Sequence, residues 1–196
     1  MDLTDPGLCN DYIALERLDE IHREPLRVSN AVEFMWLSLP AVQRGAGFDA
    51  YFDHILSSAK KSRIIPFALR DPQRDGRFVG VTAFIDPDRT HRRVNIGYTW
   101  IEPYLRGKGI YSAIQRLMIQ RALDWGARRI GWPIESENTR AIRAVESIGA
   151  IREGTLRSNA RFADGQWVDI TICSMLRDEA KAALLRLDEA IAAKQA

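Results

Sequence analysis

The sequence predicts an α+β or mixed α/β domain in which helices flank a largely antiparallel sheet of about seven strands. Strand-like segments come between segments whose apolar residues recur at helical spacing. Three of the strand-like segments follow one another directly, and two more are joined by a short Asp-Gly turn, which favours antiparallel pairing. No linker divides the chain, so we expect a single domain over residues 1–196, with 178–196 as a C-terminal helical extension.

The first half of the chain combines a short strand, helical segments and a three-stranded meander. Apolar residues at helical spacing predict a helix at Asp49–Lys60, and Pro25 limits the helical segment before it. The turn-rich stretch RDPQRDG separates the first two strands of the meander. In chain order we expect a strand at 9–18, helical structure at 18–37, a helix at 49–60, and strands at 63–69, 77–85 and 92–101.

The last strand of the meander alternates so regularly that each of its two faces has a defined set of side chains. We expect one face to carry Val94, Ile96, Tyr98 and Trp100. The opposite face is expected to carry Arg93, Asn95, Gly97 and Thr99.

The second half alternates helices with strands and ends in a hairpin and a helix. Gly126 and Gly149 each follow a helical segment and suit the position just past a helix end. The expected elements are a helix at 110–125, a strand at 128–134, a helix at 138–148, strands at 150–162 and 166–176, and an amphipathic helix at 178–196.

Composition narrows the classes of function. The 196 residues are 46% hydrophobic and 28% charged, which is an ordinary globular balance. A net charge of +2 and scattered arginines give no reason to expect nucleic acid as a partner, and no apolar run is long enough to predict a membrane span. Cys9 and Cys173 form no metal-ligand motif, which favours a reducing, cytoplasmic setting. The three histidines form no cluster, so we assign no metal: His22, His54 and His91.

The stretch EPYLRGKGIYSAIQRLM places two glycines and two positive charges where a helix must begin. Glycine allows close approach to the backbone, and a helix N-terminus offers unpaired N–H groups, so this loop predicts an anion-binding site. A P-loop would need G-x-x-x-x-G-K-(S/T), which is absent, and the Rossmann pattern G-x-G-x-x-G lacks its last glycine here. Taken alone, RGKG is better explained as a solvated turn with a glycine-assisted helix start, and the surrounding strand and helix favour the anion site.

Two motifs together resemble the GNAT acetyltransferase family. Arg106 to Tyr111 follows the family's coenzyme loop, (Q/R)-x-x-G-x-(G/A), except that Tyr111 stands at the last, normally small position. The stretch ENTRAIRAVESIGAIREG resembles the downstream family segment in which an Asn opens a helix. The whole chain is similar to the RimJ/RimL-like branch, most clearly from Asn95 to Leu176.

The resemblance implies a GNAT fold and acetyl-CoA as co-substrate. Backbone amides of the loop would hold the pyrophosphate, and an amide near the end of the preceding strand would polarise the thioester carbonyl. Asn138 would contact the pantetheine arm, although Asn also suits a helix N-cap. Arg143 or Arg140 would reach the 3′-phosphate, and the alternative is that these arginines are only solvated. The implied coenzyme-binding residues are Trp100, Ile101, Arg106, Gly107, Lys108, Gly109, Ile110, Tyr111, Asn138 and Arg143.

Catalysis by resemblance requires an unprotonated amine and a proton for the departing thiolate. Glu135 is the first candidate for the base, and Glu102 and Glu137 are alternatives. The alternative explanation for each of them is an ordinary surface carboxylate. Together with Glu135 and Glu102, Asn138 completes the implied catalytic set. The family often places a Tyr seven residues after that Asn, or a Ser three residues after it, as the acid. Here those positions hold Val145 and Ala141.

The function that the resemblance implies is acetyl-CoA-dependent N-acetylation of a primary amine by direct attack. The acceptor would be a protein N-terminus or a small-molecule amine, and the sequence does not decide between them. The sequence also does not decide whether the protein forms a homodimer. Because the usual acids are missing, a weak or inactive acyl-CoA-binding module is the alternative. Aromatic residues of the N-terminal helical region would shape the acceptor site or simply pack in the core: Phe34, Trp36, Phe48 and Tyr51.

Overall fold

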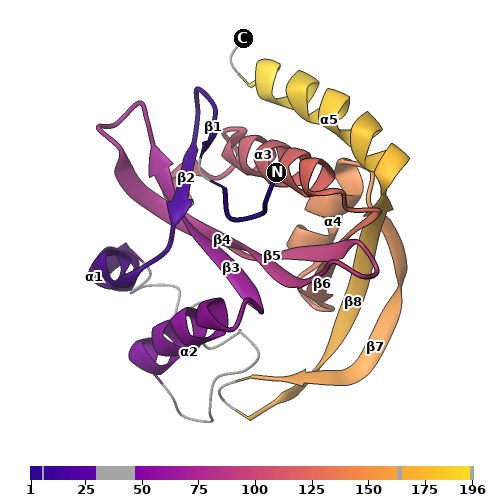
Figure 1. The fold of residues 1–196 in the computed structure, drawn as a ribbon, viewed down its shortest axis with the longest axis horizontal. Coiled ribbons are helices and arrows are strands. Elements are labelled where there is room, and N and C mark those ends of the chain that lie inside the picture. Colours follow the sequence, from indigo (N-terminus) through magenta and orange to yellow (C-terminus); the bar gives the residue numbers. More distant parts are fainter. Residues whose placement is uncertain (6, 30–46, 163–164, 195–196) are drawn as a thin grey trace.

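The structure is a computed structural model and describes residues 1–5, 7–29, 47–162 and 165–194. One eight-stranded sheet runs through these residues in the order β1-β2-β3-β4-β5-β6-β8-β7. Neighbouring strands are antiparallel except β5 and β6, which are parallel (Figure 1). The predicted mixed α/β class with a largely antiparallel sheet is confirmed, with eight strands instead of about seven.

The elements follow the predicted order. The strands are β1 (Leu8–Cys9), β2 (Ala14–Arg17), β3 (Ile64–Asp71), β4 (Arg77–Asp88), β5 (Arg93–Ile101), β6 (Arg129–Glu135), β7 (Ile151–Arg161) and β8 (Trp167–Leu176). The α-helices are α1 (Arg23–Ser29), α2 (Phe48–Lys60), α3 (Ile110–Trp125), α4 (Thr139–Ser147) and α5 (Arg177–Ala192) within the described residues. The described part of the chain also contains two short 3₁₀ helices, η1 (Glu20–His22) and η3 (Pro103–Leu105).

The additional strand arises at the N-terminus, where the predicted strand 9–18 is divided in two. The Asn10 side-chain oxygen accepts hydrogen bonds from the amides of Tyr12 and Ile13, both at 3.0 Å, and turns the chain back on itself. The predicted helical region 18–37 begins with η1 and α1, and Pro25 lies in the first turns of α1, where its missing N–H costs little. Residues 30–37 lie outside the described residues.

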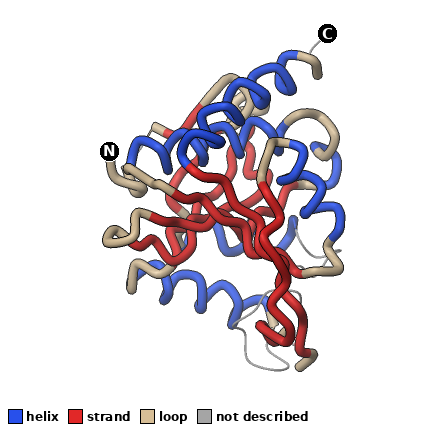
Figure 2. Tube along the Cα trace, turned by 90° about the vertical axis from the view of Figure 1, so that its right-hand side faces the viewer, coloured by secondary structure: helices blue, strands red, loops and turns tan. Residues whose placement is uncertain are grey.

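Two hydrophobic cores lie on opposite faces of the sheet. The larger core joins α3, α4 and α5 to one face, with Ile114, Val145 and Leu187 among its buried residues. The smaller core joins α1 and α2 to the other face through Leu26 and Phe52. Figure 2 shows the sheet between helices on both sides, with the β7–β8 hairpin extending beyond them.

Helix α5 packs along α3 instead of standing apart. Its Ala180, Ala183 and Leu187 are fully buried in the larger core, and Asp188 accepts a 2.8 Å hydrogen bond from Arg116 Nε of α3. Figure 1 shows that α5 runs back along α3, so that its C-terminal end lies near the start of α3. The sheet and α3 thus fix the position of α5 as far as its last turn.

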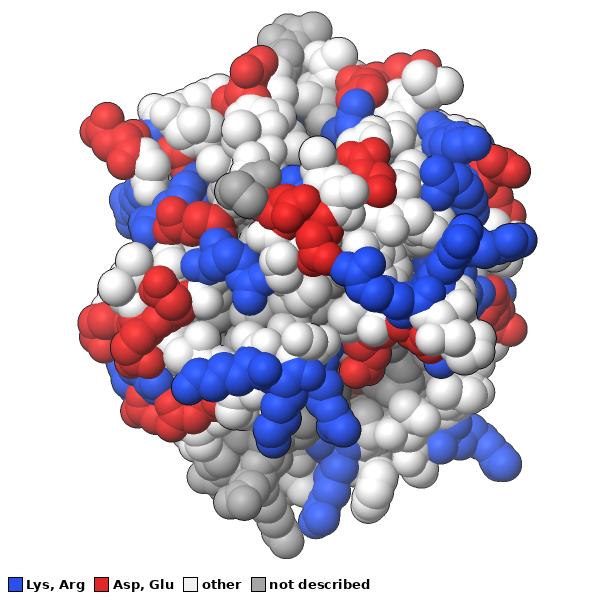
Figure 3. All heavy atoms as spheres, viewed as in Figure 1, with Lys and Arg blue, Asp and Glu red and all other residues white. Residues whose placement is uncertain are grey.

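The charged side chains of the face seen in Figure 3 are of both signs and are interspersed over it. Among the described helices, none is long and apolar enough to cross a membrane.

A charged cluster joins the three strands at the far edge of the sheet. Arg129 Nη1 of β6 donates to Glu153 Oε1 of β7 at 2.5 Å and to Ser174 Oγ of β8 at 2.8 Å. Ser174 Oγ in turn donates to Glu153 Oε1 at 2.6 Å. The Arg129 guanidinium and then the Ser174 hydroxyl lower the pKa of Glu153 from 4.5 to about 2.

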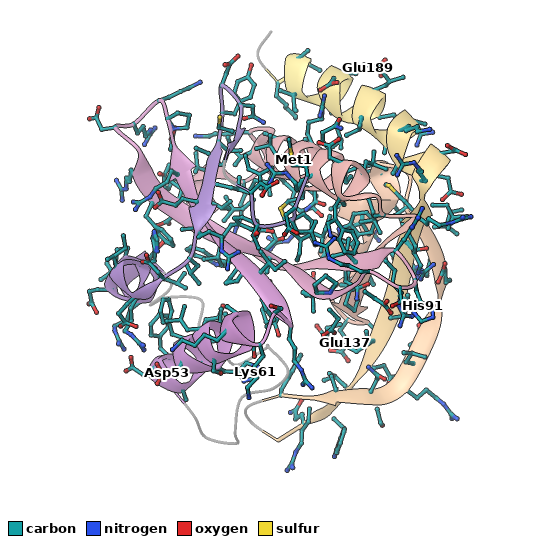
Figure 4. All side chains as sticks on the ribbon, viewed as in Figure 1. Met1, Asp53, Lys61, His91, Glu137 and Glu189 are labelled. Carbon is teal, nitrogen blue, oxygen red and sulfur yellow. The ribbon has the colours of Figure 1, made fainter. Side chains whose placement is uncertain are left out.

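This lowered pKa predicts a stability that depends on pH. The ionised Glu153 carboxylate stabilises the fold above pH 4.5, and this contribution is lost as the pH falls toward 2. Since the side chain is 42% exposed, solvent screening limits the effect to about 1 kcal/mol. We expect the free energy of unfolding of Glu153→Gln to change less between pH 5 and pH 2 than that of the wild type. It is measured by urea titration at steps of about 0.5 pH unit. The control is Glu189→Gln, on the exposed side of α5 (Figure 4), and its free energy of unfolding should depend on pH as in the wild type. The same pH dependence in all three proteins would refute the assignment.

Candidate active site

The parallel strands β5 and β6 pair only at their beginnings. Three positions are paired, from Arg93 opposite Arg129 to Asn95 opposite Gly131. Beyond them β5 stays with β4 as far as Ile101, whereas β6 stays with β8 as far as Glu135. The C-terminal halves of two adjacent strands therefore separate, and an opening forms in the middle of the sheet.

Strand β5 contains a bulge inside this opening. Its register with β4 passes from Gly97 opposite Ala83 to Trp100 opposite Val81, so two residues of β5 face one of β4. Tyr98, in the bulge, has a φ of +52°, which is unusual for a residue with a bulky side chain. The bulge therefore reverses which side chains point to each face of the sheet.

This bulge makes one prediction wrong. Val94 and Ile96 lie in the larger core, but Trp100 lies in the smaller core and Tyr98 packs against it. The four side chains therefore do not share one face. Strict alternation in the sequence concealed the inserted residue, because a bulge changes the register without changing the residue pattern.

The backbone of Ile101 faces away from β4. The amide of the next residue, Glu102, donates to the Val79 carbonyl of β4 at 3.0 Å. Successive residues of a strand direct their backbone groups to opposite edges, so Ile101 directs its N–H toward the side that β6 has left. Consistently, the Ile101 carbonyl is not used by β4 and accepts a 3.1 Å hydrogen bond from Arg106 Nε.

The loop after β5 presents unpaired backbone amides at the start of α3. Gly107 and Gly109 have φ angles of +77° and +81°, which glycine adopts without strain. The first hydrogen bond of α3 is donated by Ala113 to the Gly109 carbonyl at 3.0 Å. The amides of residues 110–112 precede it and have no acceptor within the helix, and Gly109 offers no side-chain cap. This arrangement suits an anion such as a phosphate.

The two cations of the loop have different positions. Arg106 is half-buried, and its bond to Ile101 braces the loop against the end of β5. Lys108 is exposed, with its Nζ 6.0 Å from the centre of the Tyr104 ring. Lys108 therefore adds positive charge at the loop surface, while Arg106 mainly shapes the loop.

Tyr111, the residue that departs from the family pattern, points into the protein. Its ring packs against the larger core, and burial raises the pKa of its hydroxyl well above the ordinary value of 10. The ring therefore belongs to the packing beneath α3, and the backbone amide of Tyr111 remains part of the loop.

The second arm of the opening leads from β6 into α4. Asn138 is the N-cap of α4: its side-chain oxygen accepts a 3.1 Å hydrogen bond from the Ala141 amide. The capping role proposed from sequence is confirmed, and contact with a coenzyme stays a prediction. Arg140 and Arg143 are exposed on α4, so Arg143 is accessible to a ligand at this end of the sheet.

The candidate carboxylates lie on the two separate arms. Glu135 ends β6, is half-buried, and accepts a 3.3 Å hydrogen bond from the Glu137 amide. Glu102 follows β5, and its carboxylate accepts a hydrogen bond from the Ser29 hydroxyl at the end of α1. Figure 4 shows Glu137 just past the end of β6, where it is exposed. No interaction brings Glu102 and Glu135 together among the described residues, and their catalytic roles stay predictions.

The positions that often hold an acid in the family have structural roles here. Val145 is fully buried in the larger core, and Ala141 lies in the first turn of α4, where its amide completes the Asn138 cap. Phe48 and Tyr51 are buried in the smaller core, which confirms core packing for both. Phe34 and Trp36 lie outside the described residues.

Sequence reasoning missed two residues that lie close to the loop. A Cβ atom added to Gly109 would lie 3.4 Å from Cβ of Lys194, which follows α5. Arg74, in the turn between β3 and β4, lies 5.2 Å from the centre of the Tyr104 ring. The amphipathic pattern of the tail indicated that it packs, but no local signal shows which surface it packs on.

The parted strands, each followed by a helix whose N-terminus faces the opening, define this as a fold of the GNAT type. The chain belongs to the GNAT acetyltransferase family, because the model described as an acetyltransferase (GNAT) domain matches residues 13–151. The predicted fold and the enzyme class are thereby confirmed: the protein is an acetyltransferase.

Curated relatives and solved structures agree with this class. The chain is 31% identical over 113 residues to Mb2688, an uncharacterized N-acetyltransferase of Mycobacterium bovis, covering 54% of this chain and 69% of the relative. A GCN5-related N-acetyltransferase from Brucella melitensis is 26% identical, with a TM-score of 0.76 over 92% of this chain and 83% of the other. RimJ of Mycobacterium smegmatis, in complex with CoA-disulfide, is 20% identical, with a TM-score of 0.75 over 91% and 88%. The last likeness shows the fold alone and does not establish the RimJ/RimL branch.

The Asn138 cap yields a stability prediction. Asn138→Ala removes the acceptor of the Ala141 amide and should lower the free energy of unfolding by about 1 kcal/mol in urea titrations. Asn138→Ser keeps a side-chain oxygen at the N-cap and should stay within about 0.5 kcal/mol of the wild type. Equal losses in both variants would show that the cap bond does not stabilise α4.

Proposed function

We propose that this chain is an acetyl-CoA-dependent N-acetyltransferase of the RimJ/RimL-like branch that acetylates a primary amine by direct attack. The observation that carries the proposal is the opening between β5 and β6 beside the Gly109 loop. The free edge of β5 can pair with an extended pantetheine arm, while the loop amides accept the pyrophosphate. The CoA-disulfide named for the RimJ structure supports this choice of coenzyme.

The remaining coenzyme contacts follow from this placement. The backbone from Arg106 through Tyr111 surrounds the phosphates, and Lys108 adds an exposed positive charge. Asn138 contributes its side-chain NH₂ group, because only its oxygen is used by the helix cap. Arg143 contacts the 3′-phosphate from the exposed side of α4. Within this stretch the amides of Arg106 and Lys108 already donate to the carbonyls of Pro103 and Leu105, so the amides of residues 110 and 111 remain as donors for the phosphates.

The reaction is a direct acyl transfer. The amine nitrogen attacks the thioester carbonyl carbon, so that a C–N bond forms and the C–S bond breaks. The Ile101 amide, which faces the opening, donates a hydrogen bond to the carbonyl oxygen, where negative charge develops. Glu135 receives the proton that the nitrogen loses, directly or through water, and the sulfur takes up one proton on leaving.

The acceptor is a protein N-terminus or a small-molecule amine. An α-amino group titrates near about 8, so part of it is unprotonated at neutral pH, whereas a lysine-like amine near about 10.4 needs a stronger base. A half-buried carboxylate such as Glu135 is sufficient for the first kind of acceptor. Spermidine, named as the substrate of the structurally similar SpeG of Vibrio cholerae, represents the second kind.

We also propose that residues 1–196 form one domain, with 178–196 as its C-terminal extension. The buried contacts of α5 with the larger core support this organisation. A cytoplasmic setting is proposed because Cys9 and Cys173 are both free thiols.

The proposed function is tested by the release of free thiol from acetyl-CoA. The purified chain is incubated with acetyl-CoA and a panel of peptide N-termini, amino acids and spermidine, and free thiol is followed with a chromogenic disulfide. We expect turnover with at least one acceptor and an acetylated product by mass spectrometry. Micromolar binding of acetyl-CoA without thiol release would favour a catalytically weak or inactive acyl-CoA-binding module.

The loop assignment has its own variant. Gly109→Val places a β-branched side chain at a φ of +81°, beside the amides that receive the pyrophosphate, and should weaken acetyl-CoA binding at least about 100-fold by calorimetry. Gly126→Val is the matched control, because Gly126 has a φ of +100° at the opposite end of the same helix. Unchanged affinity in Gly109→Val, or equal losses in both variants, would contradict the loop assignment.

The base assignment concerns two neighbouring carboxylates. Glu135→Gln should lower kcat by about 10- to 100-fold with little change in the affinity for acetyl-CoA. The control Glu137→Gln changes an exposed carboxylate two residues away and should keep kcat within about twofold. A normal kcat in Glu135→Gln would transfer the role to Glu102 or to water, and a loss of kcat confined to Glu137→Gln would transfer it to Glu137.

A further inference from the structure

The C-terminal end of α5 lies directly over the loop that precedes α3. A Cβ atom at Gly109 would lie 3.4 Å from Cβ and 3.5 Å from Cγ of Lys194. The Lys194 amide donates to the Ile191 carbonyl at 3.2 Å, so Lys194 continues the last turn of α5. The side chain of Lys194 therefore starts within van der Waals reach of the position that the loop glycine leaves open.

Helix packing holds Lys194 in this place. Three residues of α5 are completely buried against the larger core, and Asp188 is bonded to Arg116 of α3 at 2.8 Å. Since α5 is attached along its length to α3, the distance from its last turn to the start of α3 is fixed by the fold. Lys194 itself is exposed, and no ion pair of its ammonium group is found among the described residues.

A pocket of about 530 Å³ adjoins the loop at this point. Its wall includes Lys108 and Gly109 of the loop, Arg74 of the β3–β4 turn and Ile191 of α5. Its acidic residue, Asp71, is already engaged: its Oδ1 accepts the Gln73 amide at 2.9 Å, and its Oδ2 lies 3.7 Å from Arg74 Nε.

The charged side chains placed around the loop among the described residues are therefore mainly positive. Lys108 and Arg74 both lie beside the Tyr104 ring, at 6.0 Å and 5.2 Å from its centre. Lys194 approaches Gly109 from the last turn of α5, one turn beyond Ile191, which lines the pocket. Lys108, Arg74 and Lys194 thus bring three long, flexible cationic side chains to the surroundings of Gly109. Lysine suits a phosphate whose orientation is set by other groups, because its ammonium is a compact point charge.

We propose that Lys194 is a coenzyme-binding residue whose ammonium group contacts the pyrophosphate held by the loop amides, so that α5 forms one wall of the coenzyme site. This inference rests on the proposed function, since it assigns a further residue to the same site. It makes the C-terminal extension part of ligand binding as well as of the core. Deletion of α5 would not test it, because the buried residues of the helix would be lost too.

The test compares point variants by calorimetric titration with acetyl-CoA and with its analogue lacking the 3′-phosphate. Lys194→Ala should weaken both ligands by about five- to tenfold, because both carry the pyrophosphate. Lys194→Glu should weaken both further, and Lys194→Arg should restore most of the affinity. Arg143→Ala, by contrast, should weaken only the ligand that has the 3′-phosphate.

Lys181→Ala is the matched control, since Lys181 is an exposed lysine of the same helix that pairs with Asp178 at 3.1 Å, well before the last turn. Its affinity for both ligands should equal that of the wild type. Unchanged affinity in Lys194→Ala, or a loss restricted to the ligand with the 3′-phosphate, would overturn the assignment. The proposed function would survive either result as long as the wild type binds acetyl-CoA and Gly109→Val weakens that binding about 100-fold.

Discussion

The separation of β5 from β6 after Asn95 and Gly131 is the constraint on which the rest of the site depends. Two adjacent strands that part leave backbone N–H and C=O groups without partners inside a sheet, which is costly unless solvent or a ligand satisfies them. Each strand is held on its outer side, β5 by β4 and β6 by β8, so the opening cannot close by simple re-pairing. The fold thus keeps open two strand edges whose backbone groups are free to pair with an extended chain.

The same separation brings two helix N-termini to one opening. Strand β5 continues through the glycine loop into α3, and β6 continues through Ser136 and Glu137 into α4. Because β5 and β6 are parallel, both helices begin at the same end of the sheet, and the partial positive charges of their N-termini act on the same region. One N-terminus is left without a side-chain cap, at Gly109, whereas the other is capped by Asn138. The difference favours the first as the anion site and leaves the second to orient a neutral part of the ligand.

Much of this could be predicted from the sequence, because the signals are local. The helix after RGKG, the glycines that end α3 and α4, and the N-cap of α4 each follow from residues within one or two turns of the position concerned. The bulge at Tyr98 could not be predicted, since it depends on pairing with β4 and leaves the alternating pattern of β5 undisturbed. The placement of Lys194 over Gly109 was equally hidden, because 85 residues separate the two positions and only the packing of α5 on α3 brings them together. Local chemistry therefore identified the loop, and tertiary packing decided what surrounds it.

The missing Tyr and Ser acids have a physical explanation in the proton balance of the reaction. Direct attack releases one proton from the amine nitrogen and requires one at the sulfur, so no net proton has to be supplied by the protein. A dedicated acid speeds the departure of sulfur, but a CoA thiol with an ordinary pKa near about 8.5 is already a good leaving group near neutral pH. Val145, which is buried in the larger core, therefore leaves out an accelerating group but no group on which the bond changes depend. Under the proposed function the site has to provide position and charge, and we assign both to the backbone of β5, the loop amides and the cations around Gly109.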